Sequence, residues 1–299
     1  MTGFVRRHPI GAFLAAAYAL SIVIFTVPIL SNHGLGVLPI ELPGNEPFLL
    51  LLTAAMVGVT FGVTAIADGR DGVRHLRRRA FHVLVSPIWY ATALLLLPVA
   101  ALAVAVAMEG TQVLSALADE PALAIGWLVE VAVAFVLINL WEELAWAGFV
   151  LHRLQPRVGP LRATVLTTWA HAALHLPLLV VVGGVSDTRI APAMYPFYLG
   201  ALFIFPLGNR TVATWLYNRS GGSVPVAGLT HSAWNLATGG VMLPALVADI
   251  EPAFSYVGFA AVALIVIAAT RGQLGYRHAA SATGASAPDA HASTTVASL

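Results

Sequence analysis

The sequence predicts an all-α, polytopic membrane helix bundle with about eight transmembrane helices. Hydrophobic residues make up 59% of the 299 residues and charged residues only 10%, whereas a soluble domain is roughly 25% charged. Apolar runs of about 20 residues, the length that crosses a bilayer as a helix, recur along the whole chain. A water-soluble core has no room for this much apolar surface, so most of it must face lipid or other helices.

The apolar runs define the expected elements in order. The spans are predicted near residues 10–31, 47–67, 83–107, 122–141, 163–183, 193–210, 223–243 and 253–270. The fourth continues as apolar sequence past Glu142 and Glu143. Residues 1–272 are expected to form one transmembrane domain with its motif region at 138–240. Residues 273–299 are expected to form a disordered cytoplasmic tail, because they contain mostly small and polar side chains with little apolar surface to bury.

The arginines predict which way the spans face. All fifteen Lys and Arg residues are arginine, and cytoplasmic loops of membrane proteins collect positive charge. With both termini inside, the inner segments hold all of them except Arg189, namely Arg6, Arg7, Arg70, Arg74, Arg77, Arg78, Arg79, Arg153, Arg157, Arg162, Arg210, Arg219, Arg271 and Arg277. This distribution predicts a multi-pass protein of the cell membrane. The basic stretch 68–82 is expected to be an orientation-setting loop, with contact to anionic lipid as the alternative.

Charge and cysteine content exclude several classes of protein. The formal net charge is only +1, so no general basic surface is available for nucleic acid. The chain has no cysteine, which excludes disulfides, thiolate metal sites and cysteine nucleophiles. The expected partners are the lipid bilayer and a peptide or membrane-protein substrate.

Few polar side chains are expected at membrane depth, where an ionisable group is costly unless it has a function or a partner. They are Glu130, Glu142, Glu143, His171, His175, His231 and Asn235. At a rise of about 1.5 Å per residue, Glu142, His175 and His231 all lie roughly 16–20 Å from arginines of the inner face. We therefore expect them to share one layer. Glu130 is more typical of helix packing.

The orientation and the chemical types of the side chains in this layer together indicate hydrolysis. His171 and His175 are four residues apart and share a helix face, whereas adjacent Glu142 and Glu143 point about 100° apart, so one Glu should lead. A carboxylate among imidazoles can take a proton from water, and an imidazole can donate to a departing amine.

At these residues the sequence resembles the CAAX protease and bacteriocin-processing family, intramembrane endopeptidases that include the type II CAAX prenyl endopeptidases. The family carries Glu-Glu-x-x-x-Arg, aromatic-x-x-x-His and His-x-x-x-Asn motifs on successive helices. Here EELAWA supplies Glu142 and Glu143, WAHAALH supplies His175, and HSAWN supplies His231 and Asn235. The resemblance implies that Glu142 activates water, that His175 assists, and that His231 and Asn235 stabilise the oxyanion.

Two positions depart from the family motifs. Ala147 stands where the motif has its Arg, so the ion pair that would hold the Glu pair is expected to be missing. This motivates an alternative function, a catalytically impaired family member acting as a membrane binding, immunity or scaffold protein. His171 stands where the family has an aromatic residue, and it either makes a polar contact or serves as an additional metal ligand.

The cofactor and the substrate stay open at this level. A glutamate mechanism needs no cofactor, but His171, His175 and His231 together with Glu142 are also a set that can bind Zn²⁺. The His-Glu-x-x-His motif of zinc proteases is absent from the sequence. A third interpretation, a proton-coupled transporter, would use Glu130, Glu142 and His175 as a relay. Nothing in the sequence encodes whether a substrate is prenylated.

Overall fold

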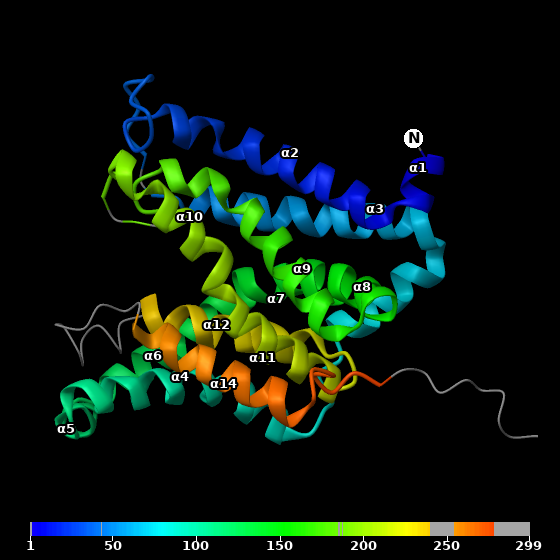
Figure 1. The fold of residues 1–299 in the computed structure, drawn as a ribbon. Coiled ribbons are helices and arrows are strands. Elements are labelled where there is room, and N and C mark those ends of the chain that lie inside the picture. The colour runs from blue at the N-terminus through cyan, green and yellow to red at the C-terminus, as the bar shows by residue number, and fades with distance from the viewer. Residues whose placement is uncertain (1, 43, 185, 187, 240–253, 278–299) are drawn as a thin grey trace, which may run out of the picture.

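In the computed structural model the described residues are 2–42, 44–184, 186, 188–239 and 254–277. Every regular element assigned to them is a helix (Figure 1), which confirms the predicted all-α bundle. Residues 278–299 of the expected tail and residues 240–243 of the seventh predicted span lie outside the described residues. Short helices without a role in the site are α1 (Thr2–Arg7), α5 (Gln112–Asp119) and η4 (Pro192–Met194).

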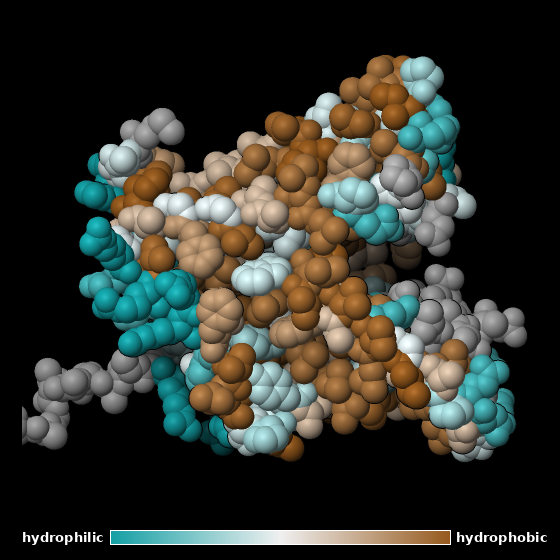
Figure 2. Space-filling view, turned by 180° about the vertical axis from the view of Figure 1, so that it is seen from behind, coloured by the Kyte–Doolittle hydropathy of each residue, from teal (hydrophilic) through white to brown (hydrophobic). Residues whose placement is uncertain are grey.

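The first four predicted spans are long apolar helices. They are α2 (Pro9–Leu30), α3 (Glu46–Ala80), α4 (Pro87–Glu109) and a composite helix over Pro121–Val158. Among the described residues, these four are the helices long and apolar enough to cross a membrane. Figure 2 shows hydrophobic residues filling the middle of one face, with hydrophilic residues gathered at its two side edges. The chain is therefore a membrane protein.

Prolines break the fifth and sixth predicted spans into shorter helices, whereas the seventh and eighth each contain one helix over their described residues. The span expected at 163–183 consists of α9 (Pro160–Leu174) and a 3₁₀ turn, η3 (Leu176–Val180). The α-helix ends at Leu174 because Pro177 has no N–H to continue the backbone hydrogen bonds and its ring would clash with the carbonyl of Ala173. The remaining helices are α10 (Tyr195–Ile204), α11 (Pro206–Arg219), α12 (Val224–Gly239) and α14 (Ser255–Ala269). The count of eight crossings and the inward-facing termini stay predictions.

Two sequence interpretations need correction. The basic stretch 68–82 is not a loop, because α3 bends at Gly69 (φ 67°) and then continues as a helix to Ala80. That second half packs on the core through Leu76, which is fully buried. Arg210 does not belong to an inner loop either. It lies within α11 and is only 2% exposed.

The helices gather around α12. It packs against α4, α7 (Leu140–Ala145) and α11, while α2 pairs with α3 on the other side of the molecule (Figure 1). Gly228 permits this packing on α7, since a Cβ there would lie 3.0 Å from Cα of Leu140. The close approach of α7, α9, α11 and α12 brings their polar residues to one place.

Candidate active site

Irregular helical turns position the two carboxylates. The composite helix consists of α6 (Pro121–Ala134), η1 (Phe135–Asn139), α7, η2 (Trp146–Leu151) and α8 (His152–Val158), and both η segments are π-helical. Glu142 and Glu143 therefore sit on a short α-helical piece between two wider turns. Such π-helical turns often occur at functional sites. Here they change the facing of the helix just before and just after the Glu pair.

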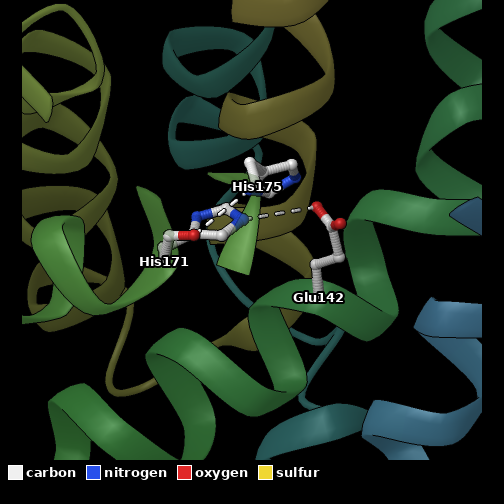
Figure 3. Close-up of side chains that lie close together, drawn as sticks. All are labelled: Glu142, His171 and His175. Atoms are coloured by element: carbon white, nitrogen blue, oxygen red, sulfur yellow. Dashed lines mark hydrogen bonds and ion pairs between the residues drawn. The ribbon is translucent and has the colours of Figure 1, made fainter. Parts of the chain in front are cut away.

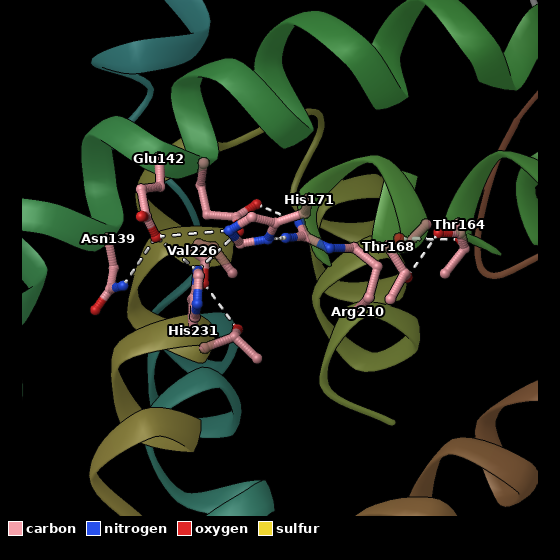
Figure 4. Close-up of polar contacts among 11 residues, drawn as sticks. Asn139, Glu142, Thr164, Thr168, His171, Arg210, Val226 and His231 are labelled. Atoms are coloured by element: carbon pink, nitrogen blue, oxygen red, sulfur yellow. Dashed lines mark hydrogen bonds and ion pairs between the residues drawn. The ribbon is translucent and has the colours of Figure 1, made fainter. Parts of the chain in front are cut away.

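Glu143 is the buried structural member of the pair. Its side chain is 0% exposed, and Nη1 of Arg210 donates to Glu143 Oε2 at 2.5 Å. Nδ1 of His231 donates to the other carboxylate oxygen at 3.0 Å. The second Arg210 nitrogen, Nη2, lies 3.2 Å from Nδ1 of His171 (Figure 4). One guanidinium from α11 therefore joins α7 and α9, and its charge neutralises a carboxylate that has no access to water.

Glu142 faces the cavity instead. Asn139 Nδ2 donates to Glu142 Oε2 at 3.4 Å, and this oxygen lies 3.8 Å from His231 Nδ1 and 4.0 Å from His171 Nε2. The cavity has a volume of about 480 Å³. Its polar lining comprises Asn139, Glu142, Thr168, His171, His175, Asn209, Arg210, His231 and Asn235. Glu143 does not line it, as the 100° separation of adjacent residues predicts.

The hydrogen bonds fix which ring nitrogen of each histidine carries the proton. Arginine has only donors, so the contact with Arg210 makes Nδ1 of His171 the acceptor, and Nε2 of the neutral ring carries the hydrogen. In His175 the arrangement is reversed, because Nδ1 donates to the backbone oxygen of His171 at 3.1 Å and leaves a lone pair on Nε2. Neighbouring imidazoles thus present opposite chemistry, one N–H donor and one acceptor.

Residues 124–237 match the family model described as type II CAAX prenyl endopeptidase Rce1-like. This segment is similar to that family, and it makes up less than half of the 299-residue chain. It contains all five predicted catalytic residues, Glu142, Glu143, His175, His231 and Asn235, and it ends shortly after the last of them. The family is one of proteases, so the match supports a hydrolase. No curated protein matches the chain.

The expected loss of the ion pair in the Rce1-like segment is wrong. Ala147 does occupy the motif position, and it is 1% exposed within an apolar cluster that includes Leu76 and Val224. Arg210 supplies the positive charge from α11, and its Nη1 reaches Glu143 directly. Sequence spacing missed this pair because the two residues lie on different helices.

The hydrogen bonds restrict which of these residues could bind a metal. Glu142, His171 and His175 offer ligand atoms within 4.8 Å of one another (Figure 3), and the predicted set contained these three residues together with His231. His171 Nε2 is buried and has no hydrogen-bond partner among the described residues. However, a neutral imidazole has one lone pair, and Arg210 already takes it at Nδ1. His171 therefore presents an N–H to the cavity, which cannot ligate a metal.

The structure brings the predicted site residues together and adds two. His171, His175 and His231 surround Glu142, and Asn235 lines the same cavity. Asn139 and Arg210 were missed. Asn139 follows an apolar run in the sequence, yet it is 2% exposed and its Oδ1 accepts a hydrogen bond from Ser232 Oγ at 2.9 Å. Its position three residues before Glu142 was the one available signal.

Proposed function

We propose that this protein is an intramembrane endopeptidase of the cell membrane that hydrolyses a peptide bond in a membrane-associated or hydrophobic peptide. One observation carries the proposal. The Glu142 carboxylate lines a cavity walled by three imidazoles inside an Rce1-like segment. The second carboxylate, Glu143, is held by Arg210 and does not compete for the cavity.

The proposed reaction begins when Glu142 accepts a proton from water. The water oxygen forms a bond to the carbonyl carbon of the peptide, and the carbonyl oxygen becomes an oxyanion. The proton then moves from Glu142 to the lone pair on Nε2 of His175, and from there to the peptide nitrogen as the carbon–nitrogen bond breaks. The products are a carboxyl group and a free amine, and Glu142 and His175 return to their starting protonation states.

Donors on the cavity wall would stabilise the oxyanion. The side-chain amide of Asn235 supplies one N–H, and the imidazole of His231, which lines the same cavity, is the second proposed contact to the oxyanion. The Nε2–H of His171 is a third donor, buried and without a hydrogen-bond partner among the described residues. Removing one such donor typically costs roughly 10²–10³ in kcat.

The test is cleavage of a mixed hydrophobic peptide library by the purified protein in nanodiscs, read by mass spectrometry. Glu142→Gln should abolish cleavage because an amide cannot accept the water proton. Glu130→Gln, the same change on the same composite helix, is the matched control and should retain activity. A chelator should leave cleavage unchanged. Cleavage by the Glu142→Gln variant would refute the role of this residue, and loss of cleavage with chelator would refute the glutamate mechanism.

The alternative of an impaired binding, immunity or scaffold protein depended on the missing motif Arg. Arg210 provides that charge 2.5 Å from Glu143, which removes the motive for this alternative. The same library distinguishes the two functions. Peptides that bind to the parental protein with no cleavage, while it retains its native melting transition, would favour the binding protein over the enzyme.

A further inference from the structure

A second cavity lies at the end of α3, and the proposed chemistry does not use it. Its volume is about 750 Å³, within the usual range for ligand sites. The lining includes Arg74, Arg77, Arg78 and Arg79 from the helix and the apolar side chains that follow it, with no acidic residue. Four guanidinium groups around one space repel one another unless an anion lies between them.

Little of this charge is neutralised within the protein. Arg74 pairs with exposed Asp71 at 2.8 Å. Throughout the described ranges, no carboxylate oxygen lies within 4.0 Å of the other three guanidinium groups, those of Arg77, Arg78 and Arg79. Arg79 Nη1 contacts only a histidine nitrogen at 3.2 Å, and its Nε is buried with no hydrogen-bond partner among these residues. The cavity is thus prepared to receive hydrogen-bond acceptors with negative charge.

Exposed apolar side chains border the same cavity. Phe81 is 60% exposed and Leu84 is 92% exposed. They directly precede α4, a candidate membrane span that begins at Pro87. The chain therefore enters the hydrophobic layer a few residues after the arginines, which places the guanidinium groups at headgroup level. The α3 end of the molecule corresponds to the hydrophilic left edge of Figure 2.

We propose that this cavity binds the headgroup of an anionic phospholipid. Arg77, Arg78 and Arg79 donate to the phosphate oxygens, and Phe81 and Leu84 lie along the start of the acyl chains. The combination of charge and exposed apolar surface at the membrane boundary is what such a lipid recognises. An acidic peptide would use the arginines but would leave Leu84, the most exposed of these apolar side chains, without a contact.

Binding of phosphatidylglycerol and of phosphatidylcholine to the full chain in neutral detergent, measured by native mass spectrometry, tests the proposal. Phosphatidylglycerol should bind more tightly. The double substitution Arg77→Gln with Arg78→Gln should weaken phosphatidylglycerol binding about 25-fold, because each arginine near a membrane surface contributes about fivefold to affinity. The control, Arg157→Gln with Arg162→Gln, removes the same charge from exposed positions outside the cavity and should change affinity less than about twofold. Equal affinity for both lipids, or equal weakening by both double variants, would overturn the site.

A second variant separates a lipid from other anions. Leu84→Ser alters an exposed side chain, so the fold should be unaffected. It should weaken phosphatidylglycerol binding severalfold and leave the binding of inorganic phosphate unchanged. If it weakens neither, and an acidic peptide displaces the lipid equally from parental and variant protein, the surface is a protein-docking site and the proposal fails. Because no step involves peptide cleavage, these results stand apart from the proposed enzymatic function.

Discussion

Replacing Arg210 with Met tests the most consequential contact of the site. The substitution removes the guanidinium from a position that is 2% exposed and leaves Glu143, which is 0% exposed, without its cation. Breaking a buried ion pair in this way costs about 3–5 kcal/mol, because the remaining charge stays desolvated. His231 still donates to Glu143 at 3.0 Å, so we expect the lower end, about 3 kcal/mol. At about 2–4 °C per kcal/mol this lowers the melting temperature by roughly 6–12 °C.

The assay is thermal unfolding in detergent, followed by tryptophan fluorescence. Arg210→Met combined with Glu143→Gln should recover much of the loss, because no uncompensated charge remains. The matched control is the ion pair of Arg153 with Asp68, in which the Arg153 side chain is 13% exposed and the Asp68 side chain 43% exposed. Arg153→Met should cost at most about 1 kcal/mol. If Arg210→Met and Arg153→Met lower the transition equally, or if the double variant melts no higher than Arg210→Met alone, the electrostatic role assigned to Arg210 is refuted.

Three further variants probe the site and its support. Asn139→Leu removes the donor to Glu142, and a hydrogen bond to a charged acceptor is worth about 1.5–3 kcal/mol. The kcat for peptide cleavage should therefore fall about 10- to 100-fold with little change in KM. An unchanged kcat would contradict this role of Asn139. Gly258→Val places a Cβ 2.6 Å from the backbone oxygen of Ala100 and should cost about 1–3 kcal/mol in thermal unfolding. Gly69→Ala forces a side chain onto a φ of 67° and should cost about 1–2 kcal/mol in the same assay, whereas full tolerance would show that the bend relaxes freely.

The fold class and the first four spans were predictable because they depend on apolar content and length. Each long apolar run, such as Pro9–Leu30 or Pro87–Glu109, predicts a membrane span without information from the rest of the chain. Pro177 is visible in the sequence too, but a single proline does not show whether a helix kinks or ends at that point. The second half of α3 was missed for a different reason. Its many arginines are typical of a loop, while the contact that makes it a packed helix, through Leu76, depends on residues far along the chain.

The sequence predicts the grouping of the histidines but not which ring nitrogen of each carries the proton. Their grouping around Glu142 followed from helical rise and from four-residue spacing, and the structure agrees with that grouping. Their chemical states did not follow, because each depends on the partner of the second ring nitrogen. His171 and His175 share one helix face, yet a guanidinium and a backbone oxygen give them opposite protonated nitrogens. The metal set stays a prediction, because the partner of the second ring nitrogen decides which imidazoles have a lone pair to offer a metal.

Arg210 also shows what the buried carboxylate of Glu143 requires physically. The need is a cation beside a buried carboxylate, and any helix that delivers a guanidinium to hydrogen-bond distance satisfies it. Because it comes from α11, Arg210 contacts Glu143 on α7 and His171 on α9 together. It therefore links three helices in addition to neutralising the carboxylate. The position of three helices and the proton of one imidazole then depend on a single side chain. An Ala at position 147 is consequently no evidence of lost activity, because the charge it lacks enters the site from elsewhere.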